Sequence, residues 1–136
     1  MKDDIPKESY TGTRYKVVHC EGALKSYEAA VNRVERRKHK KFTRAIIMQI
    51  ERLANGERMT KENFPQEGNL PKSKGKNKSK KFHALKRIPI RGYCWLSDKH
   101  KDTYFISHYV YKDYANLKDS DTKKVKANWL KVEEGK

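Results

Sequence analysis

Residues 81–129 read KFHALKRIPIRGYCWLSDKHKDTYFISHYVYKDYANLKDSDTKKVKANW and decide the fold of this 136-residue chain. Parts of this stretch are rich in Tyr, Trp, Phe, Ile and Val, which fit a pleated sheet better than a helix. We therefore predict three strands, at Lys81 to Ile90, Tyr93 to Ser97 and Thr103 to Lys112. A turn is expected at Asp98 to Asp102.

Apolar residues at helical spacing predict helices both before and after these strands. Two stripes precede them, formed by Leu24, Tyr27, Val31 and Val34 and by Phe42, Ile46, Ile50 and Leu53. The two helices are expected to be separated near Arg36 to Lys41, and Asn55-Gly56 is expected to end the second. Asp119 or Ser120 can cap a last, lysine-rich helix, in which Val125, Trp129 and Val132 share a face.

The remaining segments complete an α+β order of strand, two helices, antiparallel sheet and C-terminal helix. Tyr15 to Cys20 alternates enough to be a first strand, and residues 1–13 are polar and expected to fray. Residues 57–81 contain prolines and glycines among alternating lysines, which predicts a flexible basic loop. The length fits one domain over residues 1–136.

Charge is the strongest compositional signal. Lys and Arg number 33 against 17 acidic residues, a formal net charge of +16, which favours a polyanionic partner. Hydrophobic content is only 35%, but the Trp, Tyr and Phe residues supply the apolar area that disordered chains lack.

The two cysteines, Cys20 and Cys94, have neither the spacing of a zinc site nor the number needed for a disulfide framework. No apolar window is long enough to span a bilayer, and the first residues do not resemble a signal peptide. We expect a cytoplasmic protein that has no membrane partner and reduced thiols.

Strand parity gives a first hypothesis about a site. His83, Arg87 and Arg91 are separated by even numbers, so one unbroken strand would place them on one face, as a cationic row. Pro89 implies an edge or a bulge between Arg87 and Arg91, which would reverse that parity. A solvated surface is the alternative role for these arginines.

The third predicted strand resembles a segment of the RelE and HigB toxin superfamily. Those toxins show an extended L-x-x-F-x-K-K segment, then a polar turn and an alanine-containing helix, and the counterpart here is Ile106 to Lys112, ISHYVYK. In this alignment Tyr109 replaces the buried Phe, and Lys112 takes the place of the second basic residue, which assists phosphate chemistry in the family. The family's Tyr-Arg pair is Tyr93-Cys94 here, so Arg91 is the candidate to replace the missing guanidinium.

The resemblance implies a RelE-like fold and a metal-independent endoribonuclease, an mRNA interferase that cleaves mRNA, either free or on the ribosome, and inhibits translation. Cleavage through the RNA's own 2′-hydroxyl needs groups that move protons and cations that stabilise the phosphorane, and it needs no cofactor. His83 and His108 are the candidates for proton transfer. Arg87, Arg91 and Lys112 are the candidates around the phosphate.

Further residues are candidates for holding RNA. Aromatic rings can stack on single-stranded bases, and lysines can contact phosphates. The aromatic candidates are Tyr93, Tyr111 and Tyr114, with Trp95 expected in the sheet core instead. The lysine candidates are Lys72, Lys74, Lys76, Lys78, Lys80, Lys81 and Lys86. No role is assigned to His19, His39 or His100.

Partners and alternatives follow from the same properties. A strongly basic ribonuclease must be restrained in its own cell, so an acidic cognate antitoxin is expected beside mRNA and the ribosome. A non-catalytic RNA- or DNA-binding protein would explain the charge with fewer assumptions. A gyrase-directed toxin of the ParE branch would keep the fold but use protein contacts.

Overall fold

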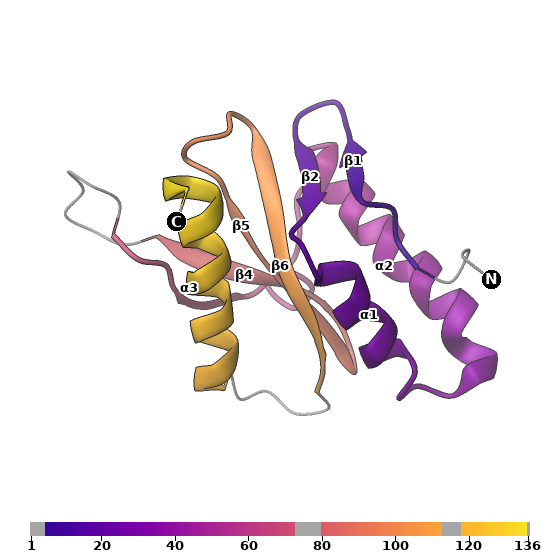
Figure 1. The fold of residues 1–136 in the computed structure, drawn as a ribbon. Coiled ribbons are helices and arrows are strands. Elements are labelled where there is room, and N and C mark those ends of the chain that lie inside the picture. Colours follow the sequence, from indigo (N-terminus) through magenta and orange to yellow (C-terminus); the bar gives the residue numbers. More distant parts are fainter. Residues whose placement is uncertain (1–4, 73–79, 113–117, 136) are drawn as a thin grey trace.

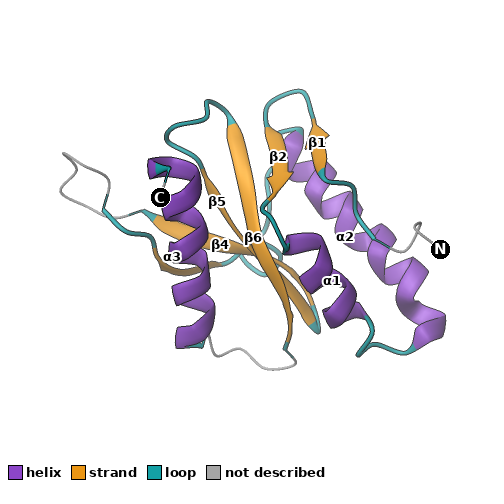
Figure 2. Ribbon diagram, in the orientation of Figure 1, coloured by secondary structure: helices purple, strands orange, loops and turns teal. Residues whose placement is uncertain are grey.

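The computed structural model describes residues 5–72, 80–112 and 118–135, and within them the protein is α+β (Figures 1 and 2). The described strands form one six-stranded sheet in the order β1-β2-β6-β5-β4-β3. The strands are β1 (Ser9–Thr11), β2 (Lys16–His19), β3 (Gln66–Asn69), β4 (Lys81–Arg87), β5 (Ile90–Leu96) and β6 (Thr103–Tyr111). The helices are α1 (Ala23–Val31), the short 3-10 helix η2 (Arg36–Lys38), α2 (His39–Ala54) and α3 (Asp119–Glu134).

The sheet is mixed, because β2 and β6 run parallel while every other neighbouring pair is antiparallel. The central hairpin of β5 and β6 carries most of the sheet's buried residues, since their aromatic and β-branched side chains pack on both faces. Tyr93 pairs with His108, whereas the next residue, Cys94, pairs with Ile106, so the β5–β6 register shifts between Tyr93 and Cys94. Ser107 is therefore the extra residue of a bulge.

Two helices cover one face of the sheet and one helix covers the other. Figure 1 shows α1 and α2 on one side and α3 on the other. The α1–α2 side contains the larger apolar cluster, with Tyr27, Ile46 and Ile50 fully buried. The α3 side contains a smaller cluster in which Trp95 packs with Val125 and Trp129.

The C-terminal end of α3 is fixed to the sheet by Glu133. Its carboxylate accepts hydrogen bonds from the Trp95 indole, the Ser97 hydroxyl and the backbone N–H groups of Asp98 and Lys99. Four donors on one carboxylate hold this end of the helix against the turn between β5 and β6.

Most predicted elements are confirmed, with four corrections. The sheet is not purely antiparallel, and β1 occupies a segment that was expected to fray. The basic loop predicted at 57–81 contains β3, while residues 73–79 lie outside the described part of the chain. The strand predicted over Lys81 to Ile90 ends at Arg87, since Ile88 and Pro89 form a turn and β5 begins at Ile90. The break between the first two helices and the end of the second at Asn55 are as predicted.

None of the helices in the described ranges is both long and apolar enough to cross a membrane.

Candidate functional site

Three of the predicted catalytic residues meet on the α3 face of the sheet. Arg91 lies on β5, His108 lies on β6, and Lys112 follows the end of β6, with side chains only 3–4% exposed. Asp121, in the first turn of α3, contacts two of these residues from the helix side. Its carboxylate lies 3.2 Å from the His108 Nε2 and 3.9 Å from the Lys112 Nζ. We call Arg91, His108, Lys112, Asp121 and Glu67, which is described next, the polar cluster.

Glu67 joins the cluster from β3, and sequence reasoning missed it. Its Oε1 lies 3.4 Å from the Arg91 Nη1. Burial raises the pKa of the Glu67 carboxyl, while the positive charges of Arg91, Lys112 and Lys86 oppose that rise. The sequence QEGN contains no β-branched or aromatic residue, so nothing in the pattern places Glu67 on a strand.

Both nitrogens of the His108 ring have partners. The Nε2 faces Asp121, and the Nδ1 lies 2.8 Å from the Ser107 hydroxyl, which the bulge turns toward the same ring. Burial lowers the pKa of His108, and the hydrogen bond and charge of Asp121 partly oppose this shift. The imidazole is therefore neutral at pH 7 and oriented by a carboxylate.

Lys112 is the least satisfied member of the cluster. Its Nζ is buried and makes no hydrogen bond to the residues that the structure describes, although Asp121 lies within ion-pair distance. Burial lowers the pKa of this ammonium group, with Asp121 and Glu67 opposing the shift and Arg91 adding to it. Two cations and two carboxylates thus lie together beneath α3.

Tyr93 is also directed toward this group. Burial raises the pKa of its hydroxyl, the negative charges of Asp121 and Glu67 add to the rise, and Arg91 opposes it. Its ring is fully buried and packs on Phe82 and His108, so it offers no face on which an RNA base can stack.

His83 and Arg87 lie apart from the polar cluster, so the predicted row of His83, Arg87 and Arg91 on one face is wrong. His83 stacks on Phe64, with ring centroids 4.5 Å apart, on the face covered by α1 and α2. Arg91 pairs with Lys86 across the β4–β5 hairpin and therefore points to the opposite face. The turn at Ile88 and Pro89 reverses the parity that one continuous strand would have had.

The predicted RNA-binding residues are dispersed. Tyr111 is covered by the Arg33 guanidinium, 4.2 Å from the ring centroid, and Lys86 is half-buried. Lys72, Lys80 and Lys81 are exposed, with Lys80 paired to Asp98. Tyr114, Lys74, Lys76 and Lys78 lie outside the described residues.

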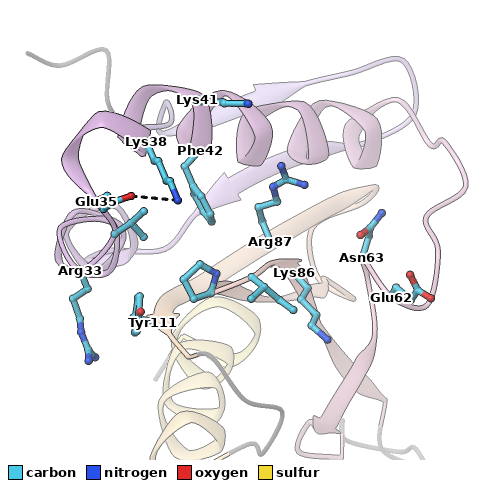
Figure 3. A pocket seen from close by; sticks show the side chains of 13 residues that line it. Arg33, Glu35, Lys38, Lys41, Phe42, Glu62, Asn63, Lys86, Arg87 and Tyr111 are labelled. Carbon is cyan, nitrogen blue, oxygen red and sulfur yellow. Dashed lines mark ion pairs between the residues drawn. The ribbon is translucent and has the colours of Figure 1, made fainter.

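An open groove lies on the α1–α2 side, between the corner where α1 leads into α2 and the turn between β4 and β5 (Figure 3). It encloses about 960 Å³. Arg87 and Phe42 point into the space between α2 and the sheet. The groove and the polar cluster therefore lie on opposite faces near the same end of the sheet. Lys86 is close to both, since it lines the groove and its charge acts on Glu67.

The polar cluster offers acid–base and electrostatic chemistry. An imidazole held by a carboxylate and a second carboxylate with a raised pKa can transfer protons, and a guanidinium and an ammonium can stabilise a phosphorane. Over the described ranges, no group of three or more His, Cys, Asp and Glu side chains is placed to hold a metal ion.

Comparisons with protein-family models, curated proteins and solved structures gave no significant match.

Proposed function

We propose that the protein is a toxin similar to RelE and HigB, an endoribonuclease that cleaves mRNA, either free or on the ribosome, without a metal and so inhibits translation. The observation that carries the proposal is the convergence of Arg91, His108 and Lys112 in one polar cluster. The sequence predicts His108 for proton transfer and Arg91 and Lys112 for contact with the phosphate, and these residues lie on or directly after β5 and β6. Perturbed titratable groups in one place are typical of functional sites.

Each step of the proposed reaction has a suitable group. The 2′-hydroxyl attacks the adjacent phosphorus while the bond to the 5′-oxygen breaks, leaving a 2′,3′-cyclic phosphate and a 5′-hydroxyl. His108, kept neutral by burial, accepts the proton of the 2′-hydroxyl, and Glu67 in its protonated form, which burial favours, supplies one to the 5′-oxygen. Arg91 and Lys112 stabilise the charge that develops on the phosphorane oxygens.

Access to the cluster requires movement of the first turn of α3. With α3 in its observed position, the Asp121 carboxylate is hydrogen-bonded to the His108 Nε2. RNA cannot reach the side chains of Arg91, His108 and Lys112, because they are only 3–4% exposed. Lifting this turn would free the His108 Nε2 and the Lys112 Nζ together. The Glu133 contacts would hold the other end of the helix in place.

The proposal is tested by cleavage of a single-stranded RNA, free and on translating ribosomes, with EDTA present. His108→Ala should abolish single-turnover cleavage and leave RNA binding intact. His83→Ala is the matched control, because its side chain lies on the other face and should leave cleavage unchanged. Equal cleavage by both variants would refute the assignment.

An acidic antitoxin remains the expected partner of such a toxin, because the formal net charge is +16. Co-expression with the product of a neighbouring gene of acidic composition should relieve growth arrest. Failure of every such product to bind the toxin would remove this part of the proposal.

A non-catalytic RNA- or DNA-binding protein is the second candidate. The burial of the polar cluster beneath α3 favours this candidate, because a binding protein needs no accessible catalytic site. Exposed lysines such as Lys72 and Lys81 suffice to contact phosphates. Salt-dependent binding with no cleavage under any condition of the assay would decide for this candidate.

A further inference from the structure

The groove on the α1–α2 side has a strongly cationic rim. Five basic side chains and two acidic ones are among its lining residues. Lys38 forms an ion pair with Glu35, with 3.3 Å between Nζ and Oε2 (Figure 3), whereas Lys41 and Arg87, which also line the groove, are exposed. An occupant with negative charge is favoured by this rim.

The groove also exposes aliphatic surface where a turn would usually be polar. Ile88, between β4 and β5, is 61% exposed, and Pro89 follows it in the turn. Half-buried Val34 and Phe42 line the groove beside them. Turns favour Gly, Asn, Asp and Ser, so an exposed isoleucine here is a candidate contact for an apolar anchor.

The lining argues for a protein segment rather than RNA. Single-stranded RNA is held by flat aromatic faces, and neither ring in the groove offers one freely. Arg33 covers Tyr111, and Phe42 packs against the core. The exposed apolar surface is aliphatic, which suits the side chains of an amphipathic helix.

We propose that this groove docks an acidic segment of a partner protein whose apolar side chains contact Ile88 and whose carboxylates meet Lys41 and Arg87. The proposal goes beyond the endoribonuclease assignment and does not depend on it, because the groove and the polar cluster lie on opposite faces of the sheet. A segment bound here leaves the cluster uncovered, so it anchors the protein to its partner without blocking the cluster.

The probe is a fluorescein-labelled acidic peptide with leucines at i, i+3, i+4 and i+7 spacing, and a labelled oligouridylate serves as the nucleic-acid probe. Fluorescence anisotropy measures both affinities for the full chain. Ile88→Ser and Lys41→Glu should each weaken peptide binding by at least about fivefold, the loss expected when a central contact is removed. The Ile88 methyl resonances should shift when the peptide is added to the wild-type protein.

Matched controls lie outside the groove. Met48→Ser removes another exposed apolar side chain, and Lys126→Glu reverses another exposed charge, so each should change peptide affinity by less than about twofold. Ile88→Ser should leave oligouridylate affinity unchanged. The proposal is overturned if the peptide does not bind, if the controls weaken it as much as the groove variants, or if oligouridylate loses as much affinity as the peptide in Ile88→Ser.

Discussion

Asp121→Asn tests whether the polar cluster depends on a carboxylate supplied by α3. The substitution keeps an oxygen that can accept from His108 but removes the charge 3.9 Å from the Lys112 Nζ. At an effective dielectric constant of about 20, that charge pair is worth about 4 kcal/mol. Because Glu67 still acts on Lys112, and because the ammonium can lose its proton, we expect a loss of about 3 kcal/mol at pH 7.

For a chain of 136 residues, this loss corresponds to a thermal midpoint lower by about 10 °C. Urea unfolding and thermal melting measure the two quantities. Asp119→Asn is the matched control, since Asp119 is exposed in the same helical turn and its substitution removes the same charge from the helix N-terminus. Adding Lys112→Met to Asp121→Asn should restore much of the stability, because no buried ammonium is then left without a counter-charge.

The pH dependence has a defined sign. Burial already lowers the pKa of Lys112 in the folded protein, so the unfolded chain binds the proton more tightly and stability rises with pH toward the unfolded value of 10.5. Asp121→Asn should lower the pKa of Lys112 further, so the free energy of unfolding of this variant should rise more steeply with pH. Its stability deficit relative to wild type should therefore shrink between pH 7 and pH 10. A deficit equal to that of Asp119→Asn, or a double variant no more stable than Asp121→Asn, would refute the reasoning.

Three further outcomes are expected. Burial lowers the pKa of His108 below 6.5, so stability should fall as the pH drops below about 6.5, and His108→Gln should flatten this slope in urea unfolding compared at pH 7 and pH 5. Gly12→Ala would place a Cβ 2.3 Å from the backbone of Ala54, so it should cost at least about 2 kcal/mol in the same assay, and a neutral result would contradict this close approach. Glu133→Ala should cost about 2 kcal/mol and accelerate amide hydrogen exchange in α3, whereas unchanged exchange would mean that its four donors do not fix the helix.

The long elements could be predicted because their patterns are strong. The stripe containing Ile46 and Ile50 identifies α2, and the aromatic and β-branched residues of Thr103–Tyr111 identify β6. β3 could not be found in this way, because Gln66–Asn69 contains none of the residue types that favour strands, and its backbone pairs with β4, which lies further along the chain. The parallel pairing of β2 with β6 likewise depends on distant parts of the chain.

The site was predicted in part, and the main error in the prediction arose from the turn between β4 and β5. In a hairpin with a two-residue turn, the paired residues Arg87 and Ile90 share a face although they are three apart in sequence. Even spacing between Arg87 and Arg91 therefore predicts the wrong face. The alignment with the toxin segment, and not periodicity, indicates Lys112, whereas nothing in the sequence pattern points to its partner Asp121, which the fold of the last helix brings to it.

The energetics of the polar cluster argue that it is not a device for stability. Buried ion pairs recover their desolvation cost only when hydrogen bonds complete them, and the Lys112 Nζ has no hydrogen bond among the described residues. Apolar residues of similar volume would pack beneath α3 at lower cost, as Val125 and Trp129 do further along the same helix. A cluster that costs stability, holds a histidine between Ser107 and Asp121, and is closed by one helical turn has the properties of a site whose charges serve a ligand or a reaction.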